Sequence, residues 1–242
     1  MKIALISDIH ANLEALEAVL SDIAKQSVDN IHCLGDVIGY GCDPVECLKL
    51  VDEHCDVKLM GNHEFAALGL LGMNDLNQFA RQSMDWTKKQ LTDHEFALIA
   101  DFEIDAVREG CYLVHSSPFE PDRWHYILRE DEAAQGFSSL KQQIGFFGHS
   151  HLPMIFSQSS EGTIRVKSGH DFDPDEETRY LINVGSVGQP RDNDPQSSYV
   201  VFDTAAVSVA FRRVEYDYKT TQAKMTRAEM PAVLIERIEI GR

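Results

Sequence analysis

The first sixty residues alternate between short apolar runs and segments whose apolar residues recur at helical spacing. The apolar runs have the length and branching of buried strands and cover residues 3–6, 31–34 and 57–60. Asn12 can cap a helix whose apolar residues extend to position 23, and Pro44 opens a second helix that reaches about residue 51. This order predicts a parallel sheet with right-handed crossovers.

The remainder of the chain has a different pattern. Residues 74–102 look helical, with core contacts expected from Trp86, Leu91, Phe96, Leu98 and Ile99. A strand at 112–114, a helix at 130–142 and a strand at 144–147 follow. Short strands that suggest antiparallel hairpins are expected at 154–157, 163–167, 179–184, 199–202 and 206–213, before a helical end at 218–239. We therefore expect one α/β (α+β) domain, residues 1–242.

Composition limits the class of protein. With 242 residues and 43% hydrophobic content, the chain can bury a full core, and its net charge of −17 argues against a nonspecific grip on nucleic acid or on an anionic membrane. A phosphate-bearing substrate stays possible, because bound cations can invert the local charge of an acidic site. The five cysteines form no Cys-x-x-Cys pair, and the chain shows no secretory or membrane-spanning segment, so we expect reduced thiols and a cytoplasmic protein.

Metal-capable side chains follow the predicted strands. Asp8 and His10 come directly after the first one, and strand alternation would turn both to the same side; the same argument applies to His149 and His151. A capping Asp followed by an incidental surface His is the alternative for the first pair. The full set contains imidazole, carboxylate and carboxamide groups without thiolate, which suits Mn, Fe, Co, Ni or Zn: Asp8, His10, Asp36, Asn62, His63, His115, His149 and His151. It is too large for one ion and favours two metals bridged by a carboxylate.

In order and spacing, five blocks of the sequence resemble the calcineurin-like metallophosphoesterase superfamily from residue 1 to about 192. They are Asp8-x-His10, Gly35-Asp36, Gly61-Asn62-His63-Glu64, His115 and Gly148-His149-Ser150-His151. Residues 183–192 further resemble the small prokaryotic phosphodiesterase-like branch. The resemblance implies a four-layer αββα sandwich of two mixed β-sheets flanked by helices.

The resemblance also implies a role for each site residue. One divalent transition-metal ion would be held by Asp8, His10 and His151, the second by Asn62, His115 and His149, and Asp36 would bridge them. His63 would face the substrate and stabilise charge or protonate the leaving oxygen, while a metal-bound hydroxide attacks phosphorus in line. His63 could instead merely cap the next helix, and His115 could cap a loop.

The candidate substrate contacts are less specific. Besides Asn62 and His63 they include Arg123 and His125, in the loop after His115, and Gln189 and Arg191, after a Gly-rich turn whose backbone donors could meet an anion. An exposed turn stabilised by Arg191 is the alternative for the latter pair.

Two departures from relatives concern the same site. Gly39 stands where protein Ser/Thr phosphatases have an Asp that orients the catalytic His. No Arg follows the second and third blocks, where those phosphatases and the symmetric dinucleoside-polyphosphate hydrolases rely on one. Neither activity is therefore expected.

We expect a phosphodiesterase that acts on a small-molecule phosphoester. A phosphomonoesterase for a nucleotide or small metabolite, and a non-catalytic interaction scaffold of the same fold, are the alternatives. The sequence leaves the oligomeric state open.

Overall fold

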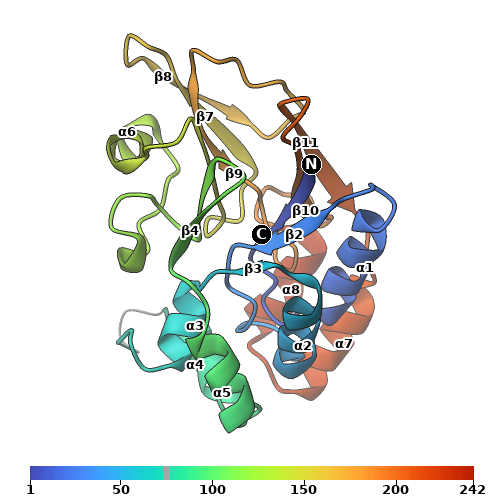
Figure 1. Ribbon diagram of the computed structural model, residues 1–242. Helices are drawn as coiled ribbons and strands as arrows, with labels where there is room; N and C mark the ends of the chain where they lie inside the picture. The colour runs from blue at the N-terminus through green and yellow to red at the C-terminus, as the bar shows by residue number, and fades with distance from the viewer. Residues whose placement is uncertain (73–76) are drawn as a thin grey trace.

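The computed structural model describes residues 1–72 and 77–242 (Figure 1). Its helices are α1 (Leu13–Ile23), α2 (Pro44–His54), α3 (Asn62–Ala67), α4 (Gln78–Thr87), α5 (Asp93–Ala100), α6 (Glu130–Ser139), α7 (Tyr218–Arg227) and α8 (Ala232–Ile240), with a short 3-10 turn at Pro121–Arg123. Its strands are β1 (Lys2–Ile6), β2 (Asn30–Cys33), β3 (Val57–Lys58), β4 (Asp105–Arg108), β5 (Cys111–Val114), β6 (Ile144–Phe147), β7 (Met154–Gln158), β8 (Ile164–Ser168), β9 (Arg179–Asn183), β10 (Ser197–Asp203) and β11 (Ser208–Val214).

Both sheets are mixed. The first has the order β11-β10-β1-β2-β3, in which β1, β2 and β3 run parallel, as predicted, and β10 joins β1 antiparallel. The second has the order β4-β5-β6-β9-β7-β8, in which β5, β6 and β9 are parallel. The expected antiparallel hairpins are present as β7–β8 and β10–β11. Strand β9 lies between β6, to which it is parallel, and β7, to which it is antiparallel.

Strand alternation divides the apolar residues among three cores, which makes four layers. On β1, Ile3 and Leu5 point into the core between the sheets, whereas Ala4 and Ile6 point toward the helices α1, α2, α7 and α8. On β6, Phe146 enters the core between the sheets and Phe147 packs toward α6 on the far side. In Figure 1, α6 lies on one side of the molecule and the larger helical layer on the other. The two mixed sheets between helical layers are the expected sandwich.

Several predicted boundaries were wrong. The single helix expected at 74–102 is two helices, α4 and α5, because Thr92 and Glu95 form a capping box that starts a new one; residues 74–76 lie outside the described part. The helical end is likewise interrupted, with Pro231 at the N-cap of α8. The third predicted strand stops at Lys58, and β4 was missed. None of the described helices has the length and apolarity that a bilayer span requires.

Candidate metal centre

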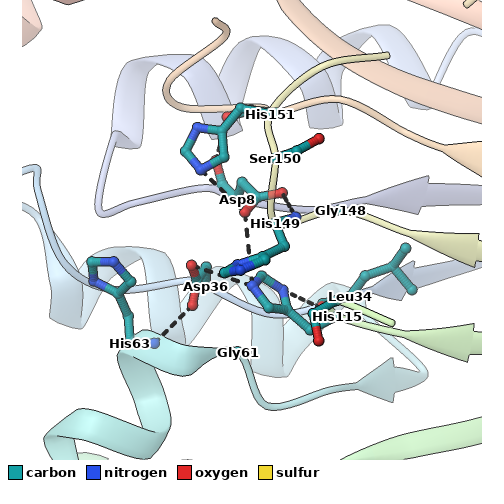
Figure 2. A network of polar contacts seen from close by, with 12 residues as sticks. Asp8, Leu34, Asp36, Gly61, His63, His115, Gly148, His149, Ser150 and His151 are labelled. Atoms are coloured by element: carbon teal, nitrogen blue, oxygen red, sulfur yellow. Dashed lines mark hydrogen bonds and ion pairs between the residues drawn. The ribbon is translucent and has the colours of Figure 1, made fainter. Parts of the chain in front are cut away.

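The predicted site residues lie in loops that leave the carboxyl ends of neighbouring parallel strands. β1 leads to Asp8 and His10, β2 to Asp36, β5 to His115, and β6 to the segment 148–151. The two sheets face each other, so these loops meet at one edge of the sandwich. Figure 2 shows the aspartates and histidines directed toward a common centre, with His63 at the start of α3.

The local backbone differs from the extended conformation predicted for these pairs. Asp8 and His10 have φ angles of +53° and +50°, and His149 and His151 have +65° and +60°. They therefore lie in the left-handed region, and side-chain alternation along a strand does not explain why they converge. Such conformations cost about 1–2 kcal/mol each for non-glycine residues. The surrounding hydrogen bonds must hold them.

Glu64 holds a further left-handed residue, Asp36, whose φ angle is +52°, and no role had been predicted for Glu64. Its Oε2 accepts hydrogen bonds from the main-chain N–H groups of Asp36 and Gly61 at 2.9 and 2.8 Å. Its Oε1 accepts from those of Val37 and Ile38 at 2.8 and 3.1 Å. The side chain is fully buried, so one carboxylate joins the loop after β2 to the start of α3. The signal was its place in the third motif block.

The first predicted ligand group is assembled. Asp8, His10 and His151 are buried, and one potential ligand atom from each lies within 4.8 Å of the others. The Nδ1 atoms of His10 and His151 lie 3.2 Å and 2.6 Å from the main-chain oxygens of Ile38 and Gln189. Because those oxygens accept, each Nδ1 carries the proton and each Nε2 presents a lone pair. The two Nε2 atoms lie 3.1 Å apart, an arrangement that a cation bound to both would stabilise.

The second group contains Asp36, His115 and His149, whose potential ligand atoms also lie within 4.8 Å of one another. Nδ1 of His115 donates to the main-chain oxygen of Leu34 at 2.9 Å, and Nε2 of His149 donates to that of Trp124 at 3.0 Å. The free nitrogen of each ring thus has its orientation set by a main-chain carbonyl, as is usual for histidine ligands.

Asp36 lies between the two groups. Its Oδ1 accepts a hydrogen bond from the main-chain N–H of His63 at 2.9 Å. Its Oδ2 is 3.7 Å from Nε2 of His10 and 3.4 Å from Nε2 of His115, one residue from each group. This is the position that a bridging carboxylate requires.

Unsatisfied atoms test whether a metal fits. Among the described residues, the buried side-chain atoms without a hydrogen-bond partner include Oδ1 of Asp8, Oδ1 of Asn62 and Nε2 of His115. Leaving such atoms unpaired costs free energy, and all three belong to the predicted ligand set. The donors are oxygen and imidazole nitrogen, which suit divalent transition metals. The residues therefore fit two such ions.

The electrostatics of the site divide its histidines. Burial lowers the pKa of His10, His149 and His151, to about 3 for His149, so these rings are neutral at pH 7. Burial also acts to lower the pKa of His115, but the nearby carboxylates of Asp36, Asp8 and Glu64 outweigh it and raise the pKa to about 9. Without metal, His115 therefore keeps a proton at neutral pH.

His63 packs against the main chain of Gly39. A Cβ atom at position 39 would lie 2.0 Å from Nδ1 of His63, and Gly39 has a φ angle of +84°. The His63 ring also lies 4.6 Å from that of Tyr40 and 4.8 Å from that of His10, centroid to centroid. By distance alone, His63 could form a third ligand group with His10 and Asp36. Its pKa is lowered by burial, so the imidazole is neutral at pH 7.

A cavity of about 710 Å³ adjoins the centre. Of the candidate substrate contacts, Asn62, His63 and Arg123 line it, together with Phe65, Trp124, Tyr126 and His149. His125 does not line it; its Nε2 lies 3.0 Å from Oε2 of Glu120, and its ring stacks on Phe119. Gln189 and Arg191 lie on the side of His151, which they contact through main-chain hydrogen bonds. The turn around Gln189 is buried rather than exposed.

Two mixed sheets flanked by helices, with candidate oxygen and imidazole ligands gathered at the loop edge, match the metallophosphoesterase fold. The family model of the calcineurin-like phosphoesterase superfamily domain matches residues 1–206. The chain belongs to this superfamily, and this membership supports a phosphoester hydrolase.

Individual relatives are similar to this chain over nearly its full length. An uncharacterized protein of Methanocaldococcus jannaschii is 37% identical over 99% of this chain and 98% of its own length. The crystal structure of a metallophosphoesterase from Sphaerobacter thermophilus is 38% identical, with a TM-score of 0.89, over 100% of this chain and 99% of that one. A hypothetical protein from Pyrococcus horikoshii shares the fold at 17% identity and a TM-score of 0.81, over 100% and 98% of the two chains.

Proposed function

We propose that this protein hydrolyses a small-molecule phosphodiester with two divalent transition-metal ions. The observation that carries the proposal is the pair of Nε2 lone pairs of His10 and His151, 3.1 Å apart in a buried site where Oδ1 of Asp8 has no hydrogen-bond partner among the described residues. One ion would be held by Asp8, His10 and His151 and the other by His115 and His149, with Asp36 contacting both. Asn62, whose buried Oδ1 has no hydrogen-bond partner in the described part of the chain, would complete the second set. Two bound cations would acidify a water molecule and offset charge on the phosphoryl oxygens.

His63 would assist the leaving group. It lines the cavity, and its Nδ1 edge is packed against Gly39. A neutral imidazole can still donate its N–H to an oxygen on which negative charge develops. Main-chain donation from His63 to Asp36 fixes the start of α3 relative to the metal ligands, so the ring position is tied to the centre.

The cavity has room for an organic group of a diester substrate. A phosphodiester carries two organic groups, and one of them needs space beside the metal centre. The cavity provides such space between Phe65, Trp124 and Tyr126, next to His63 and His149. Trp124 and Phe65 meet edge to face with ring centroids 5.2 Å apart, and Tyr126 stacks on His149 at 4.1 Å. These walls suit an organic substituent with an apolar face.

The test compares bis(p-nitrophenyl) phosphate with p-nitrophenyl phosphate after chelation and after addition of Mn²⁺, Ni²⁺ or Zn²⁺. We expect metal-dependent cleavage with a higher kcat/KM for the diester. His63→Ala should lower kcat roughly 100-fold or more, the contribution usual for general acid–base groups. His94→Ala, which removes an exposed histidine on α5, is the matched control and should behave like wild type.

The outcomes separate the alternatives. A preference for p-nitrophenyl phosphate would favour a phosphomonoesterase. Equal activity of His63→Ala and His94→Ala would remove His63 from the mechanism. No hydrolysis with any ion, in protein that retains its fold, would favour the scaffold and contradict the proposal.

A further inference from the structure

Two arginines beside the metal centre form no ion pair with an Asp or Glu side chain among the described residues. Arg191 follows β9, and Arg237 lies on α8. Both donate to one neutral acceptor, Oε1 of Gln189, at 2.9 Å from Nη2 of Arg191 and 3.2 Å from Nη1 of Arg237. Arg237 also donates to the main-chain oxygen of Arg242. Nε of Arg191 is buried and lacks a hydrogen-bond partner within the described chain.

Gln189 connects this pair to the centre. Its main-chain oxygen accepts from Nδ1 of His151 at 2.6 Å, and the main-chain N–H of Arg191 donates to the oxygen of His151 at 3.2 Å. The guanidinium carbon of Arg191 lies 5.9 Å from the ring centroid of Tyr40, and that ring lies 4.6 Å from the ring of His63. The guanidinium of Arg191 therefore borders the candidate active site.

The arrangement brings like charges together. Guanidinium groups are donors only, so the amide of Gln189 must present its oxygen to both. Elsewhere in this acidic chain, Arg212 and Arg213 of β11 are paired with carboxylates. Burial and the charge of Arg191 lower the pKa of Arg237, in keeping with an uncompensated pair. An anion bound beside both guanidiniums would offset this repulsion through charge-assisted hydrogen bonds.

We propose that Arg191 and Arg237 form a subsite for a second phosphate group of the substrate, next to the phosphoester held at the metal centre. The inference rests on the proposed function and narrows its substrate class to phosphoesters that carry a further phosphate, such as a phosphodiester with a separate phosphomonoester group. It also involves a residue outside the 1–206 region that matches the family model. The arginines that relatives place after the second and third motif blocks are absent here, so the subsite draws on other elements.

Calorimetric binding to the Mn²⁺-loaded protein tests the subsite without hydrolysis. The probes are methylphosphonate, methylenediphosphonate and propane-1,3-diphosphonate, at a fixed concentration of free Mn²⁺. We expect wild type to bind at least one diphosphonate more tightly than methylphosphonate, and Arg237→Gln to weaken that diphosphonate roughly tenfold, the loss expected for one charge-assisted hydrogen bond. Arg237→Lys should retain part of the affinity. Arg227→Gln, an exposed arginine on the neighbouring helix α7, is the matched control for charge.

A similar loss for methylphosphonate in Arg237→Gln would mean that this arginine acts on the metal centre as a whole, and would overturn the subsite. The subsite would also be overturned if Arg237→Gln bound the diphosphonate as tightly as Arg227→Gln does. Thermal unfolding of each variant shows whether it folds. If Arg237→Gln has a folding defect, the affinity of Arg237→Lys for the diphosphonate tests the subsite instead. Binding with this pattern but without hydrolysis of any ester would uphold the subsite while the proposed function fails.

Discussion

Replacing Glu64 by glutamine should loosen the metal centre although no metal ligand is replaced. The carboxylate uses each oxygen for two main-chain N–H groups, at 2.8–3.1 Å. Glutamine keeps one oxygen, so two buried N–H groups would face an NH₂ group instead of an acceptor. At about 1–3 kcal/mol for each unsatisfied group, the two sum to about 2–6 kcal/mol. This is a large part of the 5–15 kcal/mol that holds a typical domain together.

The assay is urea unfolding of the metal-free protein, with Glu95→Gln as the matched control. Glu95 is also buried, but only one of its two carboxylate oxygens, Oε2, accepts the two hydrogen bonds from Thr92, at 2.8 and 2.6 Å. A glutamine oxygen can replace it, so the control should cost less than about 1 kcal/mol. If Glu64→Gln lost no more stability than Glu95→Gln, the carboxylate would not hold the two loops, and the reasoning would be refuted.

Two further predictions concern the same centre. Gly39→Ala should displace His63 and lower kcat at least about tenfold at unchanged metal content. The control Gly110→Ala, also at positive φ but with open space around it, should leave kcat unchanged. Equal kcat values for the two variants would contradict the packing of His63 against Gly39. Binding of metal at pH 7.5 should release about one proton from His115, whose pKa is raised to about 9 and which must be neutral to ligate. Because the proton is lost above that pKa, affinity should rise from pH 7 to 9 and then level off; calorimetry in buffers of different ionisation enthalpy would show no release if this assignment is wrong.

The position of the site could be predicted from the sequence because strand order determines where the residues that follow each strand lie. Asp8, Asp36 and His115 each follow a buried apolar run, and parallel strands bring such positions to one edge. The continuous apolar run at residues 3–6 likewise predicted a buried strand, which is β1. The composition of the ligand set was enough to predict its chemistry.

Other features depend on contacts that no local pattern records. The left-handed backbone of His10 and His149 is held by long-range hydrogen bonds, so the prediction of extended segments failed there. β4 has an exposed Val107 and only Ala106 buried, which leaves no alternation to detect. The function of Glu64 is visible only once the loops after β2 and β3 lie side by side, and the partners of Arg237 only once α8 has docked.

In the proposed centre, Asp36 bridges two metal ions. The most direct measurement is a titration of chelated protein with Mn²⁺ that follows bound metal and diester cleavage together. The account predicts about two ions per chain, with activity complete only when both are bound, and a loss of the second equivalent in Asp36→Asn but not in Asp173→Asn, an exposed carboxylate. One ion per chain with full activity, or two ions retained in Asp36→Asn, would contradict it.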